Sequence, residues 1–357
     1  MTAPGRVLIF LLSGIGDTLM FTPALRLLRQ AWPQSRLVAL TMRESERDLL
    51  ALNPNLDEVR FAPLLKQSWT ANLRDALKLR GEHFDLSILP CPTNRIHYNV
   101  LAFLAGASQR AAFRYLKESR RNLDFLNNVL LPHQDNVHNV EHNLILAQTL
   151  TGASRSEDLK MQLSTSEEDR KAAESFLEKR GLTNASLLGF HISSSRAKHM
   201  ERKCWPKERF ASVIQSLGRE NPRDPFLLFC GADDLEESQW LARQNPDRMH
   251  LVQDLPIRVV AEILRRCRVL VTNDSGLQHV AAAMETPVVA IFGPTNPLRT
   301  GPWHTRSAIA RTGIACSPCF YHTSAELTCP AGIDFACLKE LSEEAVLSEI
   351  RQMISNS

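Results

Sequence analysis

The feature that most constrains the fold is an alternation, repeated along almost the whole chain, of short apolar runs with longer amphipathic segments. Short apolar runs are typical of buried strands, and the segments between them have the apolar spacing of helices. Strands that alternate with helices form a parallel sheet with helices on both of its faces. The sequence therefore predicts an α/β protein.

The alternation occurs in two series, separated by the polar stretch 154–166. A chain of 357 residues is also longer than one hydrophobic core usually supports. No repeat of the sequence itself is visible, so we expect two similar domains, at residues 1–160 and 161–340, rather than a solenoid. A last helix, residues 341–357, is expected to pack back across both domains. The predicted strands are 7–12, 37–41, 59–61, 85–89 and 110–113, then 187–191, 226–230, 249–252, 269–272 and 288–292.

Two helix starts carry recognisable signals. Thr22 and Pro23 are residue types that favour an N-cap and a first helical turn, so they predict a helix that begins there. Ser166 precedes two glutamates and predicts the start of a charged amphipathic helix that ends near Gly181.

Composition excludes several classes of protein. A net charge of +3 gives no indication of a nucleic-acid-binding protein. The apolar run after the N-terminus is six residues long, which fits a strand rather than a signal peptide. No stretch approaches the roughly 18 apolar residues of a membrane-spanning helix. We therefore expect a cytoplasmic protein whose membrane contact, if it exists, is peripheral and at the inner face of the cytoplasmic membrane.

One stretch of the first half is strongly basic. Two interpretations stay open, an anionic partner or a solvated helix face. The stretch contains Arg95, Arg110, Arg114, Lys117, Arg120 and Arg121, with Glu118 as its single acid.

The first predicted strand is followed by Ser13-Gly14-Ile15-Gly16-Asp17. A nicotinamide-type fingerprint would need a third glycine where Leu19 stands, so that reading is weak. Gly14 and Gly16 allow a tight turn and the close approach of a ligand. Asp17 either acts as a general base or caps the following helix.

In the second half, an apolar strand leads directly into Asn273-Asp274-Ser275-Gly276-Leu277-Gln278-His279 and a small-residue helix. Free backbone amides and the positive end of a helix dipole favour a diphosphate at such a junction. A capped helix would explain Asp274 or Ser275, but not the whole run.

Two further strand ends carry polar side chains. Ser193 and Ser194 follow one strand, and Lys203 lies beyond them, where its ammonium suits a phosphate. Glu236 and Glu237 follow another strand and suit ribose hydroxyls, although solvated acids at a helix start are the competing interpretation.

Four of the eight cysteines cluster near the C-terminus, at Cys316, Cys319, Cys329 and Cys337. Four thiolates suit zinc or iron, but the spacing of the second pair is not that of a zinc ribbon. A structural metal site and a set of free thiols both stay open.

These motifs resemble glycosyltransferase family nine, the ADP-heptose:lipopolysaccharide heptosyltransferases, over nearly the whole chain. The resemblance implies the GT-B fold, in which two Rossmann-like domains face each other across a central cleft. The N-terminal domain then takes the acceptor and the C-terminal domain the sugar nucleotide. The matching segments are Gly14-Ile15-Gly16-Asp17 with Thr22-Pro23-Ala24-Leu25, Lys203-x-Trp205-Pro206, 273–283, and Pro287 with Phe292-Gly293-Pro294-Thr295.

The resemblance also implies a role for each matched residue. Asp17 would deprotonate the acceptor, and configuration would invert without a metal or cofactor in the chemistry. Lys203 would hold a donor phosphate, and Glu236 or Glu237 would meet the ribose. Asp274 would contact the heptose. Ser275, Gly276, Leu277 and His279 would surround the diphosphate. Apart from the resemblance, strand-end position makes Ser193 and Ser194 candidates for the donor side, and backbone freedom and charge make Gly14, Gly16, Arg114 and Arg120 candidates for the acceptor side.

Some residues depart from the family pattern. Cys204 replaces a common arginine, and the 193–195 loop lacks the usual glycine, which puts the details of phosphate binding in doubt. Alternatives are a family member with another sugar nucleotide or another acceptor, such as a protein or a different glycan, a GT-B-fold sugar-nucleotide epimerase, or a binding protein without catalysis. The expected partners are an ADP-sugar and a lipopolysaccharide-type glycolipid.

Overall fold

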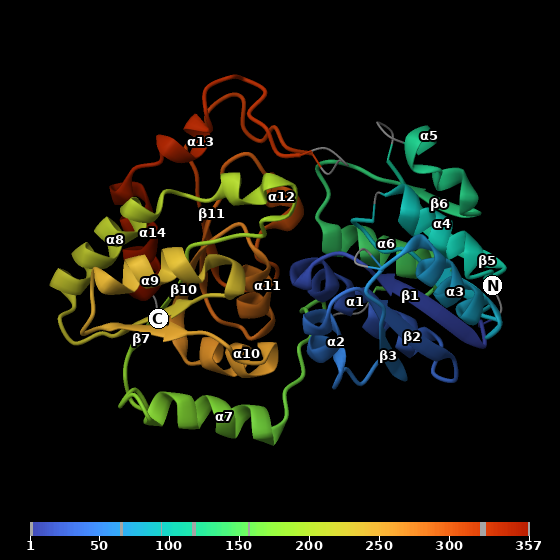
Figure 1. The fold of residues 1–357 in the computed structure, drawn as a ribbon, viewed down its shortest axis with the longest axis horizontal. Coiled ribbons are helices and arrows are strands. Elements are labelled where there is room, and N and C mark those ends of the chain that lie inside the picture. Colours follow the sequence, from blue (N-terminus) through green and yellow to red (C-terminus); the bar gives the residue numbers. More distant parts are fainter. Residues whose placement is uncertain are drawn as a thin grey trace. The chain divides into compact units, whose positions relative to one another are not determined.

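The computed structural model describes residues 3–64, 67–93, 95–115, 119–155, 158–321 and 326–355. The chain divides into two compact units, and the division falls between Ser164 and Thr165, a few residues after the expected boundary at 160. Each unit contains one six-stranded sheet in which every strand pairs in parallel with its neighbours (Figure 1). The prediction of an α/β protein with two Rossmann-like domains is confirmed.

The first unit has the strand order β3-β2-β1-β4-β5-β6. Its strands are β1 (Arg6–Leu11), β2 (Arg36–Thr41), β3 (Glu58–Phe61), β4 (Leu86–Ile88), β5 (Gln109–Arg114) and β6 (Val129–Pro132). Its helices are α1 (Ile15–Ala31), α2 (Glu44–Leu50), α3 (Trp69–Arg80), α4 (Ile96–Leu104), α5 (Ser119–Asn122) and α6 (Asn139–Thr151), with the short 3-10 helix η1 (Asp124–Leu126).

The second unit has the order β12-β11-β10-β7-β8-β9, which is the same arrangement counted from its own first strand. Its strands are β7 (Leu187–His191), β8 (Phe226–Phe229), β9 (Met249–Val252), β10 (Cys267–Asn273), β11 (Val288–Ile291) and β12 (Ser307–Ala310). Its helices are α7 (Glu167–Glu178), α8 (Lys207–Glu220), α9 (Leu235–Arg243), α10 (Ile257–Arg265), α11 (Gly276–Ala283), α12 (Pro297–Thr300), α13 (Ala336–Lys339) and α14 (Glu343–Ser355), with the 3-10 helices η2 (Ala197–Lys203) and η3 (Ala232–Asp234).

All ten predicted strands are present, and two strands were missed. The missed strands, β6 and β12, each lie at one edge of their sheet and are only partly buried, as are the predicted strands β3 and β9 at the opposite edges. Edge strands have short apolar runs because they pack against fewer neighbours, so they give a weaker signal than the central strands.

The predicted start of the first helix at Thr22 is wrong. Helix α1 begins at Ile15, with Gly14 as its N-cap, and Pro23 lies inside it. A proline at this position cannot donate to the carbonyl four residues earlier, which is that of Leu19. The Thr22 hydroxyl donates to this carbonyl oxygen instead, at 2.7 Å, so the helix continues through the proline. The other predicted start is confirmed, because Ser166 caps α7 and forms a capping box with Asp169.

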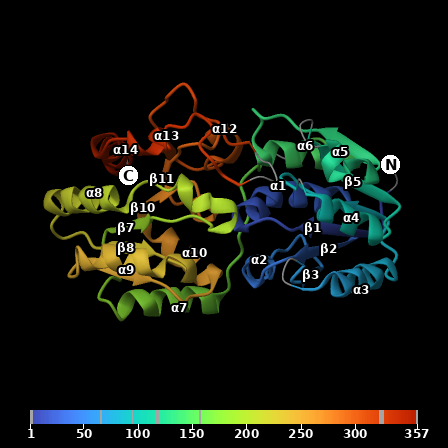
Figure 2. The ribbon, with the colours of Figure 1, turned by 45° about the horizontal axis from the view of Figure 1, so that its top comes forward.

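Helix α14 packs on the second sheet. Its apolar residues Val346, Ile350 and Met353 are buried in the core of that unit, and its contacts include β10, β11, β12 and α8. Figure 2 shows α14 beside α8 and α7 beside α10, so helices cover both faces of this sheet. Within the described residues, no helix has both the length and the apolar character needed to cross a bilayer.

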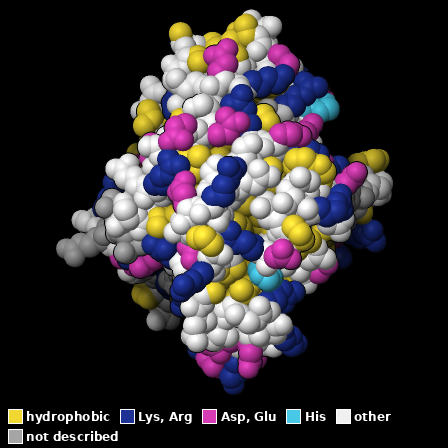
Figure 3. All heavy atoms as spheres, turned by 90° about the vertical axis from the view of Figure 1, so that its left-hand side faces the viewer, with side chains coloured by type: hydrophobic (Ala, Val, Ile, Leu, Met, Phe, Trp, Pro, Cys, Tyr) yellow, Lys and Arg dark blue, Asp and Glu magenta, His cyan; other side chains and the backbone are white. Residues whose placement is uncertain are grey.

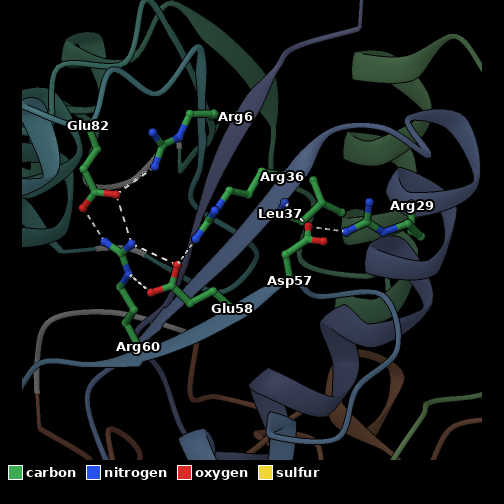
Figure 4. A network of polar contacts seen from close by, with 8 residues as sticks. All are labelled: Arg6, Arg29, Arg36, Leu37, Asp57, Glu58, Arg60 and Glu82. Carbon is green, nitrogen blue, oxygen red and sulfur yellow. Dashed lines mark hydrogen bonds and ion pairs between the residues drawn. The ribbon is translucent and has the colours of Figure 1, made fainter.

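A network of charged side chains joins the amino ends of the first three strands (Figure 4). Glu58 Oε1 accepts from Arg60 Nε at 2.6 Å, and its Oε2 accepts from Arg36 at 2.9 Å. Arg60 also contacts Glu82, which pairs with Arg6 at 2.9 Å. Hydrogen bonds from Arg60 and then Arg36 lower the pKa of Glu58 to about 2.

This network predicts an acid-dependent loss of stability. Because the pKa of Glu58 is lower in the folded than in the unfolded protein, its contribution is fully present above about pH 4.5 and is lost as the pH falls toward 2. We expect Glu58→Gln to lower the free energy of unfolding at pH 7 by about 1 kcal/mol, a modest value because the network is partly exposed. The difference from the wild type should shrink at pH 3. Urea denaturation at both pH values measures it, with Glu178→Gln, an exposed residue of α7, as the control. An equal difference at both pH values would contradict the assignment.

Candidate functional site

The strand orders fix where polar loops gather in each unit. In the first unit the chain places β2 and β3 on one side of β1 and then places β4 on the other side of β1. In the second unit β8 and β9 lie on one side of β7, and β10 lies on the other. Connections that leave two neighbouring parallel strands in opposite directions open a crevice beyond their carboxyl ends, where α/β proteins bind ligands. The Asp17 motif follows β1, and the motif that begins at Asn273 lies at the end of β10.

Asp17 lies in the first turn of α1, where its carboxylate is only partly buried. Its Oδ2 accepts from the backbone amide of Gly14 at 3.3 Å. The capping interpretation of Asp17 is therefore observed, but this contact is long and engages one oxygen. The positive end of the α1 dipole favours the ionised carboxylate, which is the form that a general base requires. The two roles do not exclude each other, and the role of base stays a prediction.

The two glycines of this motif have different surroundings. Gly14 has φ −90° and ψ 179°, an extended conformation open to any residue, so its backbone conformation does not itself require glycine. A Cβ atom added at Gly14 would meet nothing within 4 Å, so space is open beside this position. Gly16 is buried inside α1.

The loop after β4 forms the other wall of this region, and sequence analysis gave no signal for it. Ser13 Oγ donates to the carbonyl of Pro92 at 2.9 Å, and Ser13, Asp17 and Cys91 line one small depression. Asn143 of α6 holds the loop by accepting from the Cys91 amide at 2.8 Å and donating to the Cys91 carbonyl at 3.1 Å. The loop after β4, which lines the same depression as Asp17, is therefore held in place by α6.

Glu46 is a second carboxyl group in this region that sequence analysis missed. Its side chain, in α2, is fully buried, and neither carboxylate oxygen has a hydrogen-bond partner among the described residues. Arg43 lies 3.9 Å away. Burial raises the pKa of Glu46 to about 7, and the charge of Asp17 also raises it, while Arg43 lowers it. In the sequence, Glu46 lies among four other charged residues, a pattern typical of a solvated helix face.

Tyr98 of α4 lies close to both carboxyl groups. Its hydroxyl donates to the carbonyl of Leu12 at 2.9 Å, just before the Asp17 motif. Burial raises its pKa, as do the nearby charges of Asp17 and Glu46, while Arg95 and Arg43 lower it. The Arg95 guanidinium lies 5.7 Å from the centre of the Tyr98 ring. Two carboxyl groups and two guanidinium groups thus surround this tyrosine.

Among the described residues, Cys91, His133 and His142 form one group with potential metal ligands, whose atoms lie within 4.8 Å of one another. The two imidazole rings are stacked, with centres 4.6 Å apart and planes inclined by 7°. An ion binds in the plane of an imidazole, so a single ion cannot lie in both planes as the rings stand. His133 also stacks on Tyr115, which makes the group part of an aromatic stack.

The arginines of the basic stretch 95–121 have different surroundings among the described residues. Arg114, at the end of β5, and Arg120, on α5, are exposed. Arg110 instead donates to the carbonyls of Leu126 and Ala107, which gives it a structural role. Lys117 and Glu118 lie outside the described residues.

In the second unit, hydrogen bonds join the loops that follow β7 and β10. Asn273 donates to the carbonyl of Ile192 at 2.7 Å and accepts from the Trp205 amide at 2.9 Å. Ser194 Oγ donates to the carbonyl of Asp274 at 3.3 Å. The strand ends predicted to carry the donor site are therefore brought together.

Lys203 and Asp274 form a buried ion pair, with Nζ 2.7 Å from Oδ2. Gln278 donates to the other carboxylate oxygen at 2.9 Å. Burial opposes ionisation of Asp274, but the charge and hydrogen bond of Lys203 outweigh it and hold the pKa of Asp274 below its usual range. The structure brings these two predicted residues into direct contact, although the sequence places them 71 positions apart.

The N-terminus of α11 lies beside this pair. Ser275 is the N-cap, and its hydroxyl contacts Thr272 and His191, each at 3.1 Å. Gly276 begins the helix, and Leu277 and His279 follow it, with His279 buried. Burial, opposed by the charge of Asp234, lowers the pKa of His191 and favours the neutral imidazole, and this ring contacts both hydroxyl groups.

The remaining predicted donor residues lie at the neighbouring strand ends. Ser193 Oγ is 3.2 Å from His191 Nε2. Glu236 is exposed in the first turn of α9, whereas Glu237 is partly buried and pairs with Arg196 at 3.3 Å. These positions do not distinguish Glu236 from Glu237 as the residue that contacts a ribose.

The four clustered cysteines lie in the second unit and influence one another electrostatically. The pKa of Cys337 is raised to about 11, first by burial and then by the charges of Cys319, Cys316 and Cys329. Cys329 differs, because backbone amides, led by that of Phe335, lower its pKa. Within the cluster, the pKa of Cys329 is therefore shifted toward the thiolate, the form that ligates metals, and that of Cys337 away from it.

The surface of the second unit carries charges of both signs. Figure 3 shows basic and acidic side chains interspersed on one face, so no area of a single sign stands out there.

Comparison with known proteins gives a consistent result. A model described as glycosyltransferase family 9 (heptosyltransferase) matches residues 73–329. Lipooligosaccharide heptosyltransferase 2 of Campylobacter jejuni is 24% identical over 361 residues, which cover 99% of each chain. The glycosyltransferase family 9 structure from Veillonella parvula has a TM-score of 0.79 at 24% identity and covers 99% of this chain and 98% of its own. The ADP-heptose lipopolysaccharide heptosyltransferase II of E. coli has a TM-score of 0.73 at 20% identity, with 98% and 99% covered. These likenesses confirm the predicted GT-B class of fold.

The buried Glu46 predicts a pH-dependent stability. Because its pKa is higher in the folded than in the unfolded protein, its contribution is fully present below about pH 4.5 and is lost as the pH rises through 7. Glu46→Gln, which stays neutral, should therefore be more stable than the wild type at pH 8 by on the order of 1–3 kcal/mol, but not at pH 5. Thermal unfolding at both pH values measures the difference, with Glu44→Gln, an exposed residue of the same helix turn, as the control. A stability difference that does not change with pH would show that Glu46 does not titrate in this range.

Proposed function

The chain belongs to glycosyltransferase family 9, and on this basis we propose that it transfers a heptose, with inversion, from ADP-heptose to a lipopolysaccharide core acceptor. The observation that carries the donor assignment is the buried pair of Lys203 and Asp274 beside the N-terminus of α11. The relatives are named as heptosyltransferases of lipooligosaccharide or of ADP-heptose and lipopolysaccharide, which supports the donor and the acceptor class.

The second unit binds the sugar nucleotide in this proposal. The backbone amides of Gly276 and Leu277 and the α11 dipole attract the diphosphate. Lys203 is held by Asp274 and shares its ammonium protons between this carboxylate and the donor phosphate. Asp274, with Gln278 on its other oxygen, contacts the heptose hydroxyls. Ser193, Ser194, Ser275 and His279 complete this side, and Glu236 or Glu237 binds the ribose.

Asp17 acts as the general base in the first unit. Its carboxylate takes the proton of the acceptor hydroxyl as that oxygen attacks the anomeric carbon, and ADP leaves from the opposite face. Negative charge that develops on the leaving diphosphate is stabilised by Lys203 and the α11 amides. The chemistry therefore needs no cofactor.

The acceptor is recognised by the first unit. Space is open beside Gly14, whose amide contacts Asp17. Gly16 and Asp17 both lie in the first turn of α1. The exposed guanidinium groups of Arg114 and Arg120 suit an anionic glycolipid. The enzyme works in the cytoplasm, where ADP-heptose is available, against the inner face of the cytoplasmic membrane.

In this proposal the cysteine cluster holds a structural zinc or iron ion. As the described side chains stand, no three of its sulfur atoms form a ligand group, so binding the ion requires the loop to draw them together. Thiolates are preferred ligands of both metals, and residues from a loop and from α13 contribute to the cluster. The ion would cross-link these segments beside the second sheet and would take no part in the transfer.

The transfer reaction is tested by incubating the full chain with ADP-heptose, with and without a core acceptor, and measuring ADP release. We expect release only with acceptor, whereas an epimerase would convert the sugar nucleotide alone. Asp17→Asn should bind ADP-heptose with unchanged affinity, measured calorimetrically, and lose about 100-fold to 10,000-fold in kcat, since general-base catalysis supplies a factor of this size. Asp247→Asn, at an exposed position, should keep the wild-type rate. A fully active Asp17→Asn would remove the base assignment.

The metal hypothesis is tested by elemental analysis of the reduced, purified protein. About one zinc or iron ion per chain is expected, and Cys319→Ser should lose it and unfold at a lower temperature, because a structural ion stabilises the fold that binds it. Cys230→Ser, outside the cluster, should retain the ion. Metal far below one ion per chain would end the proposal.

A further inference from the structure

Helix α3 carries an apolar stripe on its exposed side. Trp69, Leu73 and Leu77 recur every four residues and therefore lie along one face. Trp69 is 73% exposed and Leu77 53%, while the opposite side of the helix buries Ala76 and Leu79. An exposed apolar stripe on a helix whose other face is already packed indicates a surface that something else covers.

Helix α4 lies beside α3 (Figures 1 and 2). It has a similar apolar stripe. Ile96 and Phe103 are 44% and 45% exposed, and Val100 lies between them. A groove of about 470 Å³ separates the two stripes, lined by Trp69, Leu73, Val100 and Leu104 among others. We call this continuous area the α3–α4 surface, defined by Trp69, Leu73, Leu77, Ile96, Val100 and Phe103.

The polar groups in the groove wall already have partners within the protein. Asn72 donates to the carbonyl of Leu64 at 2.9 Å and accepts from Gln67 at 2.7 Å. The Tyr98 hydroxyl is held by the carbonyl of Leu12. The lining is otherwise apolar apart from His97, and these polar groups are engaged by the Leu64 and Leu12 carbonyls and by Gln67, so the groove favours an apolar occupant.

Cations flank this area. Arg74 and Lys78 are exposed on α3 next to the stripe, and Arg120 and Arg121 are exposed on α5, which packs against α4. Helix α4 itself contains no charged residue, and Asp75 is the single acid of α3. An apolar stripe with an exposed tryptophan and lysine or arginine on its flanks is the composition of a helix that lies in a membrane interface.

From this arrangement we propose that the α3–α4 surface docks on an anionic lipid bilayer, with Trp69 in the interface and the flanking cations against the headgroups. The inference deepens the proposed function, on which it depends for the glycolipid nature of the acceptor. Tyr98 joins this surface to the Asp17 motif, so docking would hold the base close to a membrane-held acceptor. The N-terminal unit thus has an apolar side for the bilayer and a polar edge for the chemistry.

A second copy of the chain fits the same surface less well. A two-fold contact through this stripe would bring Arg74 and Lys78 near their own copies, and like charges that meet at an interface weaken it. Anionic headgroups have the opposite effect, because each basic side chain near the surface strengthens binding.

The experiment measures co-sedimentation of the full chain with vesicles of phosphatidylethanolamine and phosphatidylglycerol, and with neutral phosphatidylcholine vesicles. Wild type should bind the anionic vesicles, more weakly at high salt, and the neutral ones poorly. Trp69→Ser with Leu77→Ser should weaken binding by about tenfold or more, since binding grows with the apolar area inserted. Arg74→Gln with Lys78→Gln changes only exposed side chains and should weaken binding to anionic vesicles alone.

Ile145→Ser is the matched control, because Ile145 is 45% exposed on α6, another helix of the same unit. It should bind as the wild type does. Transfer to a water-soluble, deacylated acceptor should stay within about twofold in every variant, which separates a failure of docking from a failure of the proposed function. Equal vesicle binding by wild type and both double variants, or no binding by wild type, overturns the proposal. So does a wild-type dimer in light scattering that Trp69→Ser with Leu77→Ser turns into a monomer.

Discussion

Both units are organised by one constraint. In each parallel sheet the chain first adds strands on one side of the first strand and then on the other side. Because β1 and β4, like β7 and β10, are neighbours whose connections leave on opposite sides, the region beyond their carboxyl ends is not covered by a crossover helix. Backbone amides and polar side chains collect at these two positions without any cost to the apolar cores, which lie between the sheets and their helices. Asp17 and the Lys203–Asp274 pair lie at these positions for this reason.

The buried carboxyl groups near these two positions, Asp274 in the second unit and Glu46 in the first, have different partners. Asp274 has a lysine on one oxygen and a glutamine on the other, so the burial of its charge is compensated. Glu46 has only Arg43, at 3.9 Å, and neither of its carboxylate oxygens has a hydrogen-bond partner among the described residues, so burial raises its pKa to about 7. The hydrogen-bonded pair gives the second unit a fixed arrangement of charges. The weakly paired acid, whose pKa the charge of Asp17 also raises, makes the first unit sensitive to pH.

The proposed activities use different parts of the same architecture. The strand ends supply the base and the phosphate contacts, the α3–α4 surface is turned to lipid, and the cysteine cluster braces loops of the second unit. Each part depends on a different kind of interaction, namely hydrogen bonds with ion pairs, apolar area, and thiolate coordination. A change in one part can therefore be tested without removing the others.

The sequence by itself determined the class of fold, ten of the twelve described strands and the motifs at the ends of β1 and β10, because apolar periodicity and glycine-containing strand ends are local signals. It did not determine β6 and β12, two partly exposed edge strands whose apolar runs are only three residues long. It also misplaced the start of α1, since the Thr22 hydroxyl that replaces the missing donor of Pro23 depends on helix geometry. Only the tertiary structure decided that Lys203 meets Asp274, that Glu46 is buried beside Asp17, and that the stripes of α3 and α4 lie side by side. These contacts join residues far apart in the chain, and their energies depend on burial, which no local pattern specifies.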